Sequence, residues 1–530
     1  GSPTVVAEYL YGHLQRWWSQ QPPFIPQIWK DAWLTFLPKP GKPNTCPSHL
    51  RPISLMEPLG KIVIGLLTQC LKSQVLDRLV GSPHFGFLPM RSATDALCRV
   101  ARHCAQIRSL VGAHRRTPMQ RISHAPKTTI CGGLSLFLDM TRAFDNVWRL
   151  HLFNHLQDIG VTPDITSLLA SWHEGTQYQL TAPHTTTSVA VGKGLRQGCK
   201  AAPLLWVLFM DKFLCTLSHK TGSDWIAECL TLYADDVHIG CQFANLTELR
   251  LSLKNIGLVL DTLEEMRLEL SYTKTFVMLA VAGTNHRAAL KGIQRQSPAG
   301  TTILIPRSTG QNTALPMKAS GTYLGMIMSY RSFEEQSWAH RTKSAWTAFR
   351  RLQPWIKNRQ IHLQHRLHLW TSCVHTILTY SVFALQCTTK ILHLYQATVY
   401  RMLRSVIGDH AYVTHHTHQQ AIRHQQLQPP LQMLRRLAMT HFARVTARMT
   451  QIAPHDFLHT LSWTHLAETI RLIDMLQDQH AQVPIDPDPD RPVLTREAQR
   501  CPHCPFSTTS LPNYRRHMTV VHSSYQHRTA

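Results

Sequence analysis

The stretch LSLFLDMTRAFDNV, at residues 134–147, predicts a buried β-strand that ends in acidic residues. The residues from Leu134 to Leu138 form a short apolar run of the length that strands favour. Asp139 ends the run, and Asp145 follows six residues later, where it is also suited to cap a helix. The strand therefore delivers the Asp139 carboxylate to one end of a sheet.

A second acidic stretch, CLTLYADDVHIGCQ, lies at residues 229–242. Its Tyr233-Ala234-Asp235-Asp236 segment separates two apolar runs, which predicts a β-hairpin with the acids at its tip. Adjacent acids repel one another unless a cation lies between them. Transfer of a nucleotide to a 3′-hydroxyl uses two divalent ions about 3.5–4 Å apart, and Asp139 together with this pair offers ligands for them. An acid pair in a turn is more often only solvated, so the accompanying motifs decide.

Seven stretches in this order resemble the motifs of reverse transcriptases, in particular those of non-LTR (LINE-type) retrotransposons. They are WLTFLPKPGKPNTCPSHLRPISLMEPLGKI (33–62), HFGFLPMRSATDAL (84–97), FLDMTRAFDNV (137–147), GLRQGCKAAPLLWVLFMD (194–211), LYADDVHIG (232–240), LELSYTKTFVM (268–278) and TYLGMIM (322–328). Residues before the first stretch and after residue 331 resemble the family more loosely. The resemblance implies an RNA-directed DNA polymerase.

The implied fold is α+β, a right-hand polymerase with fingers, palm and thumb. We expect an N-terminal helical extension at 1–25, fingers at 26–130, a palm at 131–330 that includes part of the fingers, a basic helical thumb and connection at 331–480, a linker at 481–500 and a zinc finger at 501–530. Residues 111–130 lack a clear period and predict a loop. Residues 281–320 predict an irregular excursion.

The resemblance also assigns the catalytic residues. It makes Asp139, Asp235 and Asp236 the ligands of two Mg²⁺ or Mn²⁺ ions. Lys274 matches a lysine that serves as a general acid for the departing pyrophosphate. Leu324 and Gly325 match the primer grip, the hairpin that holds the 3′ end of the primer, although both residues also suit simple strand packing.

Other matched residues are expected to bind the incoming nucleotide. Phe144 falls where the family places a bulky ring that excludes a ribose 2′-hydroxyl; the alternative is an ordinary core phenylalanine. Gln197 would contact the deoxyribose, and Gly198 would let the backbone approach the nucleotide closely.

Three basic residues in the first motif, Lys39, Lys42 and Arg51, are expected to grip the triphosphate. Arg51 is the strongest of the three, because a guanidinium makes a forked contact with phosphate oxygens. Each of them, Lys42 above all, also suits a plain surface charge.

The composition indicates a polyanionic partner. Lys and Arg outnumber Asp and Glu by 55 to 31, which gives a net charge of +24. From Gln336 to Thr450 there are 15 Lys and Arg residues and one acid, Asp409. Apolar residues recur at helical spacing in the same segment, as at Trp346 and Phe349. We therefore expect a helical surface that contacts nucleic acid, and neither an apolar run of membrane-spanning length nor a signal peptide is evident.

The C-terminal stretch has the pattern C-x₂-C-x₁₂-H-x₄-H, formed by Cys501, Cys504, His517 and His522. Two thiolates and two imidazoles at this spacing predict one tetrahedral Zn²⁺ site on a small ββα unit. His503 lies inside the knuckle and is expected to be a bystander. Such a finger binds DNA, RNA or protein, and the sequence leaves these alternatives open.

The expected partners are an RNA template, a DNA primer or target DNA and dNTPs, without a membrane. A separate or truncated endonuclease domain is expected, because the resemblance begins at the fingers. Target-primed synthesis implies a nuclear location with a cytoplasmic ribonucleoprotein stage. Two rival functions remain: an RNA-dependent RNA polymerase, against which Ala234 and Phe144 argue, and a non-catalytic nucleic-acid-binding protein with a decayed palm, against which the intact acids argue.

Overall fold

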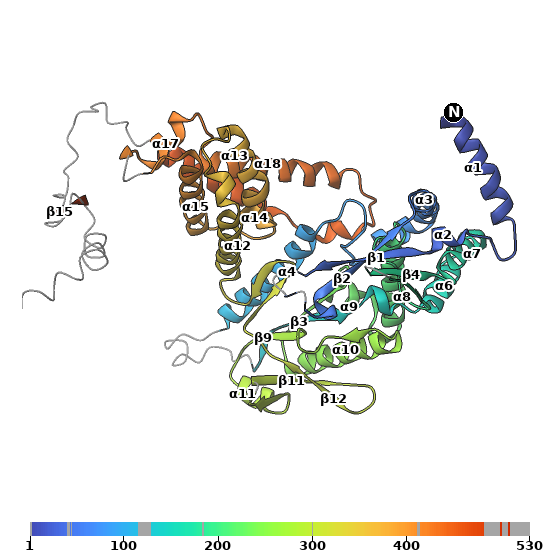
Figure 1. Cartoon of the computed structure of the whole chain (residues 1–530). Helices are drawn as coiled ribbons and strands as arrows, with labels where there is room; N and C mark the ends of the chain where they lie inside the picture. The colour runs from blue at the N-terminus through green and yellow to red at the C-terminus, as the bar shows by residue number, and fades with distance from the viewer. Residues whose placement is uncertain are drawn as a thin grey trace, which may run out of the picture. The chain divides into compact units, whose positions relative to one another are not determined.

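The computed structural model describes residues 3–39, 43, 45–114, 129–182, 185–298, 300–410, 414–481, 499–500 and 507–508 (Figure 1). The chain forms two compact units, Gly1–Ile473 and Asp474–Ala530. The boundary falls inside the last long helix, before the linker that is expected at 481–500. The elements from α1 to α18 all belong to the first unit.

A five-stranded antiparallel sheet, called here the central sheet, lies at the middle of the first unit (Figure 1). Its strands are β3 (Cys131–Thr141), β6 (Leu230–Tyr233), β7 (Asp236–Phe243), β8 (Glu269–Leu270) and β9 (Phe276–Ala282). The order is β6-β7-β3-β8, and β9 also pairs with β3. The strand and the hairpin that the acidic stretches predict are therefore confirmed.

Helices cover both faces of the central sheet, and β3 is therefore buried along most of its length. Leu134, Leu136 and Leu138 belong to the main hydrophobic core, whereas Phe137 belongs to a second core with residues of α4. Helix α4 (Ala93–Ala113) packs against β3 and β9, whereas α9 (Ser223–Cys229) and α10 (Leu246–Glu265) pack against β7. A further layer follows, in which α8 (Ala202–Thr221) packs against α10 and α6 (Arg149–Asp158), and α6 packs against α7 (Pro163–His173). The side chain of Asn245 caps α10 by accepting a hydrogen bond from the Glu248 amide (2.9 Å).

A second sheet, called here the N-terminal sheet, has the strand order β2-β1-β4-β5. Its strands are β1 (Ala32–Pro38), β2 (Leu50–Met56), β4 (Gln177–Ala182) and β5 (Thr185–Ala190). The helical elements around it in sequence are α1 (Pro3–Trp18), α2 (Gln27–Lys30), η1 (Pro47–His49) and α3 (Pro58–Val80). Among the described residues, α3 is the one helix whose length and composition match a membrane span, but core helices pass the same test. Its buried side, which includes Val63, Leu67 and Leu71, belongs to the main core.

The prediction of an irregular excursion at 281–320 is wrong, because this segment forms regular secondary structure. It contains α11 (His286–Lys291) and an antiparallel sheet of β10 (Gln294–Ser297), β11 (Gly300–Pro306) and β12 (Asn312–Pro316). Ile303, Ile305 and Leu315 are fully buried in the main core. The strands are short and separated by glycine, proline and polar residues, so their pairing is specified by packing on the rest of the molecule. Of the loop expected at 111–130, residues 111–113 belong to α4, and 115–128 lie outside the described residues.

A hairpin and a group of helices follow. The hairpin is β13 (Ser320–Tyr323) and β14 (Met326–Ser329), and the helical elements are α12 (Phe333–Ile356), α13 (Leu363–Trp370), η3 (Thr371–His375), α14 (Thr376–Thr379), η4 (Val382–Ala384), α15 (Thr389–Ile407), α17 (His418–His424), α18 (Pro430–Met449), η5 (Phe457–Thr460) and α19 (Thr464–Ala481). The basic segment is thus helical, as its apolar period predicts. Phe349 and Ile356 are buried, whereas Trp355 is 59% exposed.

The second unit contains two short paired strands, β15 (Gln499–Arg500) and β16 (Ser507–Thr508). They flank residues 501–506 in the sequence. The predicted zinc ligands Cys501, Cys504, His517 and His522 lie outside the described residues.

Candidate active site on the central sheet

Three aspartates meet at one end of the central sheet; they are called here the acidic cluster. In the antiparallel register of β3 and β7, Asp139 lies directly opposite Asp236. Asp235 precedes Asp236 in the two-residue turn that joins β6 to β7, where Ala234 has φ +52°. The indole of Trp206 on α8 donates a hydrogen bond to the Ala234 carbonyl (2.9 Å) and so fixes the turn. The structure therefore brings together the three acids that the sequence singles out.

Two carboxyl groups of the acidic cluster, those of Asp235 and Asp236, have raised pKa values. Loss of hydration raises the pKa of the Asp236 carboxyl to about 7, and the negative charges of Asp235 and Asp139 add to this rise. The pKa of Asp235 is also raised, first by loss of hydration and then by Asp139, although solvent still reaches this side chain. Like charges at this spacing are stabilised when a cation binds between them.

A protein cation already lies against the cluster. The Lys274 ammonium approaches the two carboxylate oxygens of Asp139 at 2.9 and 3.2 Å. Lys274 precedes β9, and its side chain is 64% exposed. This exposed pair holds Lys274 at the site, and a metal ligated by Asp139 would compete with the ammonium for the same oxygens.

The donor set fits hard divalent cations. Carboxylate oxygens are the ligands that Mg²⁺ prefers, and Mn²⁺ accepts the same set. The raised pKa of Asp236 supports this fit, because loss of hydration and the two neighbouring carboxylates disfavour its charged form, which a bound divalent cation would favour.

Phe144 lies beside the acidic cluster in η2 (Phe144–Asn146). Its ring stacks on Trp206 with the centroids 5.0 Å apart at 20°, and it meets Phe87 edge-on at 6.1 Å. The residue is half-buried. Phe144 is therefore held by two aromatic neighbours, which agrees with a packing role, and a role in nucleotide selection stays a prediction.

The loop that contains Gln197 and Gly198 is joined to the N-terminal sheet. The Ser54 amide on β2 donates to the Gln197 carbonyl (2.7 Å). Gly198 has φ +123°, and a Cβ atom there would lie 2.4 Å from the Ser54 carbonyl oxygen. Only glycine suits this position, because both the backbone angle and the close approach exclude a side chain. The close approach at Gly198 in the structure is to the backbone of β2, whereas the approach to a nucleotide that the resemblance implies stays a prediction.

Two of the three basic residues of the first motif lie in the described chain. Arg51 is exposed on β2, and its positive charge opposes the rise in the pKa of the Asp235 carboxyl. The Lys39 amide, just after β1, donates to the His49 carbonyl (2.8 Å), which closes the β1–β2 connection. Lys42 lies outside the described residues. The N-terminal sheet therefore presents a cation toward the acidic cluster.

Leu324 and Gly325 form the turn of the β13–β14 hairpin, with φ values of +44° and +80°. Leu324 packs on the same small core as Tyr233, the residue that enters the acidic turn. Gly325 lies near Tyr380, which follows α14. The predicted primer grip thus lies next to the acidic turn and to the C-terminal helices.

One cluster has metal-ligand types that sequence reasoning does not single out. His155, Asp211 and Cys215 bring their ligand atoms close together in the core. Arg78 already donates to Asp211 Oδ2 and to Cys215 Sγ, both at 2.8 Å, and His155 Nε2 lies 2.9 Å from Asp211. The guanidinium supplies the positive charge there, so the cluster is satisfied as an ion-pair network. The sequence also gives no signal for the role of Trp206 as a support of the acidic turn.

Comparisons with known proteins agree with this arrangement. Residues 37–328 match the family described as reverse transcriptase (RNA-dependent DNA polymerase). The chain is 27% identical over 216 residues to the probable RNA-directed DNA polymerase from transposon BS of Drosophila melanogaster, with 40% of this chain and 22% of the relative covered. It is 25% identical over 221 residues to the RNA-directed DNA polymerase from mobile element jockey of Drosophila funebris, with 41% and 22% covered. The chain thus spans about a fifth of the length of these relatives.

Among solved structures, apo telomerase from Candida tropicalis superposes with a TM-score of 0.36 and 9% identity, over 86% of this chain and 73% of that chain. The sequence match to the family, by contrast, includes the acidic cluster, Phe144, Gln197, Gly198 and the β13–β14 turn. Because this match covers more than half of the chain, the protein belongs to the reverse transcriptase (RNA-dependent DNA polymerase) family.

Proposed function

We propose that the protein is an RNA-directed DNA polymerase that copies the RNA of a non-LTR retrotransposon into DNA. The observation that carries this proposal is the direct pairing of Asp139 with Asp236, with Asp235 in the adjoining turn. The printed names of the relatives, RNA-directed DNA polymerases from transposon BS and from mobile element jockey, support the same activity.

The reaction joins the primer 3′-oxygen to the α-phosphorus of a dNTP and releases pyrophosphate. Asp139, Asp235 and Asp236 would hold two divalent ions, which when bound activate the attacking oxygen and stabilise the charge on the leaving group. Lys274, already at this site, would donate a proton to the departing pyrophosphate. Its contact with Asp139 in the metal-free protein places the ammonium next to the carboxylates that would ligate the ions.

Binding and selection of the nucleotide fall to the neighbouring residues. Arg51, with Lys39 and Lys42, would contact the triphosphate from the N-terminal sheet. Gln197 and Gly198 would border the deoxyribose, held in place by the bond to Ser54. The rigidly packed Phe144 ring would exclude a 2′-hydroxyl, and Leu324 with Gly325 would hold the primer end.

In this assignment the central sheet is the palm, the N-terminal sheet belongs to the fingers, and the helices from α12 onward form the thumb and connection. A cavity of about 590 Å³ supports nucleic-acid contact by these helices. Its lining includes Arg350 and Lys357, from α12 and the residue after it, and Arg401 of α15. None of the three has an acidic partner among the described residues, whereas the neighbouring Arg404 is paired with Asp409 (2.7 Å).

For the C-terminal module we propose a Zn²⁺ finger held by Cys501, Cys504, His517 and His522. The spacing of the four residues supports it, as does the antiparallel pairing of β15 and β16 on either side of the first two ligands in sequence. The finger would hold target DNA or template RNA while the palm extends a nicked 3′ end, with the nick made by an endonuclease domain or partner. Such target-primed synthesis implies a nuclear location with a cytoplasmic ribonucleoprotein stage.

Primer extension tests the polymerase proposal. The full chain, given poly(rA), oligo(dT) and dTTP, should synthesise DNA in the presence of Mg²⁺. Synthesis from oligo(rU) and UTP in its place would identify an RNA-dependent RNA polymerase. Binding of the duplex without synthesis from either nucleotide would identify a non-catalytic binding protein.

Deletion of residues 498–530 tests the proposed finger. Homopolymer extension should remain close to that of the full chain, whereas the affinity for native nucleic acid should fall and its salt dependence become shallower. Atomic absorption should show about one zinc per full chain and none in the deletion. Loss of extension together with binding would make the module a structural brace, and unchanged binding would make it a protein-recognition module.

A further inference from the structure

The turn that carries Asp235 is supported from behind by the loop between α3 and α4. The Phe85 amide donates to the Leu232 carbonyl (2.7 Å), and the Leu232 amide donates to the Pro83 carbonyl (3.0 Å). A Cβ atom on Gly86 would lie 2.5 Å from the Ala234 nitrogen, so the two backbones touch. The position of the turn therefore depends on the shape of this loop, which spans residues 81–92.

A single side chain sets the shape of the loop. The Arg91 guanidinium donates to the carbonyl oxygens of Val80, Ser82 and His84, all of which belong to the loop or to the helix end before it. The Arg91 side chain is fully buried. Because the guanidinium is planar and rigid, its hydrogen bonds to three carbonyl groups constrain the backbone conformation of the loop.

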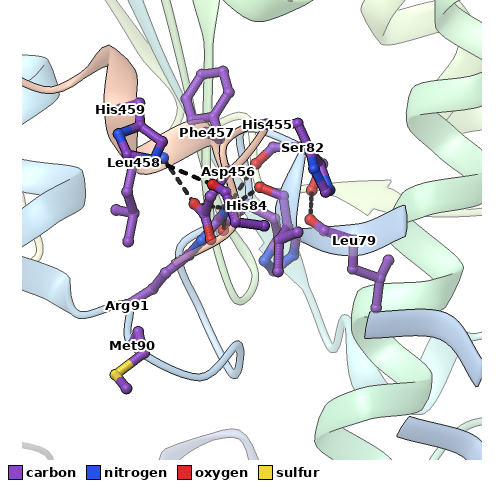
Figure 2. A network of polar contacts seen from close by, with 12 residues as sticks. Leu79, Ser82, His84, Met90, Arg91, His455, Asp456, Phe457, Leu458 and His459 are labelled. Atoms are coloured by element: carbon purple, nitrogen blue, oxygen red, sulfur yellow. Dashed lines mark hydrogen bonds and ion pairs between the residues drawn. The ribbon is translucent and has the colours of Figure 1, made fainter. Parts of the chain in front are cut away.

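The buried cation is neutralised from a distant part of the chain. Asp456, which follows α18, accepts from Arg91 Nη2 at 2.8 Å, and its side chain is 5% exposed (Figure 2). Asp456 Oδ1 also accepts from the Leu458 amide (2.9 Å) and so caps η5. Burial lowers the pKa of Arg91, and the charge of Asp456 opposes this effect. The carboxylate thus keeps Arg91 charged where it holds the loop.

A second buried pair, of opposite polarity, joins the same two segments. Arg448 of α18 contacts both carboxylate oxygens of Asp95, at 2.8 and 3.0 Å, where Asp95 caps the start of α4. Arg448 also donates to the Met90 carbonyl (2.9 Å). The pairs Arg91–Asp456 and Asp95–Arg448 are called here the charged junction. The junction holds the end of α18 and the segment that follows it beside the loop.

Apolar contacts connect the charged junction to the site. Phe457, next to Asp456, meets the Phe85 ring edge-on with the centroids 6.0 Å apart. Phe85, Phe457, Leu458 and Leu461 form a small core on which Tyr233 and Leu324 also pack. Residues of η5 and Leu461 just after it thus contact the loop, the acidic turn and the β13–β14 turn together.

We propose that Asp456, acting through Arg91, is a positioning residue for the acidic turn, so that the segment Arg448–Leu461 is part of the polymerase active site rather than a mere extension of the thumb. The inference rests on the proposed polymerase function. Without the Asp456 carboxylate, the buried guanidinium loses its counterion and the loop relaxes. A displacement of the turn by about 1 Å lowers the rate of the chemical step about a hundredfold.

The test compares Asp456→Asn with the parent chain and with Glu335→Gln, the same carboxylate-to-amide change at an acid whose exposed ion pair with Lys390 lies in the same helical region. Pre-steady-state addition of one dTTP to oligo(dT) on poly(rA), at several Mg²⁺ concentrations, gives two values: the burst amplitude counts active sites, and the burst rate reports the rate of each site. For Asp456→Asn we expect a burst rate about tenfold to a hundredfold lower, a higher Mg²⁺ requirement and an unchanged affinity for primer–template. Glu335→Gln should match the parent.

Two further variants guard against misfolding. Arg91→Lys keeps the charge next to Asp456 but loses the forked contacts with the loop, and its burst rate should also fall. Asp456→Glu should restore part of the rate. A reduced burst amplitude with a parental burst rate per site, in Asp456→Asn or Arg91→Lys, would overturn the inference and leave a purely structural role. If the parent chain polymerises and these variants match it, this inference alone is contradicted. If the parent chain is inactive, the proposed function on which the inference rests is contradicted.

Discussion

Two groups of aspartates act on the same turn, and they differ in their partners. In the acidic cluster the carboxylates face one another, and the pKa of Asp236 rises to about 7. In the charged junction Asp95 and Asp456 each face a buried guanidinium at 2.8 Å. The first group carries unbalanced negative charge at the surface of the site, and the second carries balanced charge in the interior.

The difference separates binding from scaffolding. Like charges held together weaken the fold unless a ligand neutralises them, so the acidic cluster indicates a cation from outside the protein. Opposite charges with matched geometry need no ligand, and removing one partner leaves an unpaired buried charge. The charge balance around an aspartate thus indicates which of the two roles it has in this chain.

The largest effect is expected at the acidic cluster. Asp235→Ala should lower primer extension by about a thousandfold or more, because a loss of about 4 kcal/mol of transition-state stabilisation follows when a ligand of both ions is removed. Fluorescence anisotropy should show nearly unchanged binding of primer–template. Glu335→Gln, an exposed acid on α12, is the matched control and should retain parental extension. Appreciable synthesis by Asp235→Ala at any Mg²⁺ concentration would refute its assignment as a ligand.

The comparison predicts opposite effects on stability. Asp95→Ala should lower the free energy of unfolding by about 3–5 kcal/mol, since it strands the Arg448 guanidinium in the interior. Asp236→Asn should leave the metal-free protein as stable as the parent or more stable, since it removes repulsion. Urea unfolding with EDTA measures both, and Lys390→Ala should cost at most about 1 kcal/mol. Equal destabilisation by the two aspartate variants would erase the distinction between the groups.

Phe144 contacts both regions, through Trp206 near the acidic turn and through Phe87 in the loop that Arg91 holds. Phe144→Ala should reduce the preference for dTTP over UTP at least about tenfold, which corresponds to about 1.4 kcal/mol. The ratio of kcat/KM for the two nucleotides on poly(rA) and oligo(dT) measures this preference. The exposed ring of Phe442 on α18 provides the control variant Phe442→Ala. If Phe144→Ala discriminates as well as the parent, the ring serves only in packing.

The smallest effect concerns pH. A carboxyl whose pKa is raised by folding, as that of Asp236 is to about 7, binds its proton more tightly in the folded state. This contribution to stability is fully present below the pKa of the unfolded carboxyl, near 4, and is lost as the pH rises through about 7. The Tm of the metal-free protein should therefore fall between pH 5 and pH 8, less so for Asp236→Asn. Saturating Mg²⁺ should remove most of this fall, and a Tm that rises with pH in EDTA would show that the repulsion is absent.

Much of the acidic site follows from local sequence. The run from Leu134 to Asp139 lies within β3, and the Tyr233–Asp236 segment forms a hairpin turn. A strand with both faces buried is mostly apolar, and polar residues favour a turn. For Gly198 the sequence predicts an approach to a nucleotide, and only the structure shows the contact with the backbone of β2. The roles of Lys274, Phe144 and the triphosphate-binding cations follow from the resemblance and stay predictions.

The sequence by itself therefore determined the composition of the acidic cluster and the order of the elements that carry it. Only the tertiary structure decided which charges balance which. Arg91 lies in a stretch that the sequence singles out, but its partner Asp456 is 365 residues away. The residues around either one do not indicate that the two form an ion pair. The β10–β12 sheet was likewise not predictable from the sequence, because short strands take their register from the core on which they pack. Local propensity and periodicity act over a few residues, whereas ion pairing and burial act between any segments that the fold brings together.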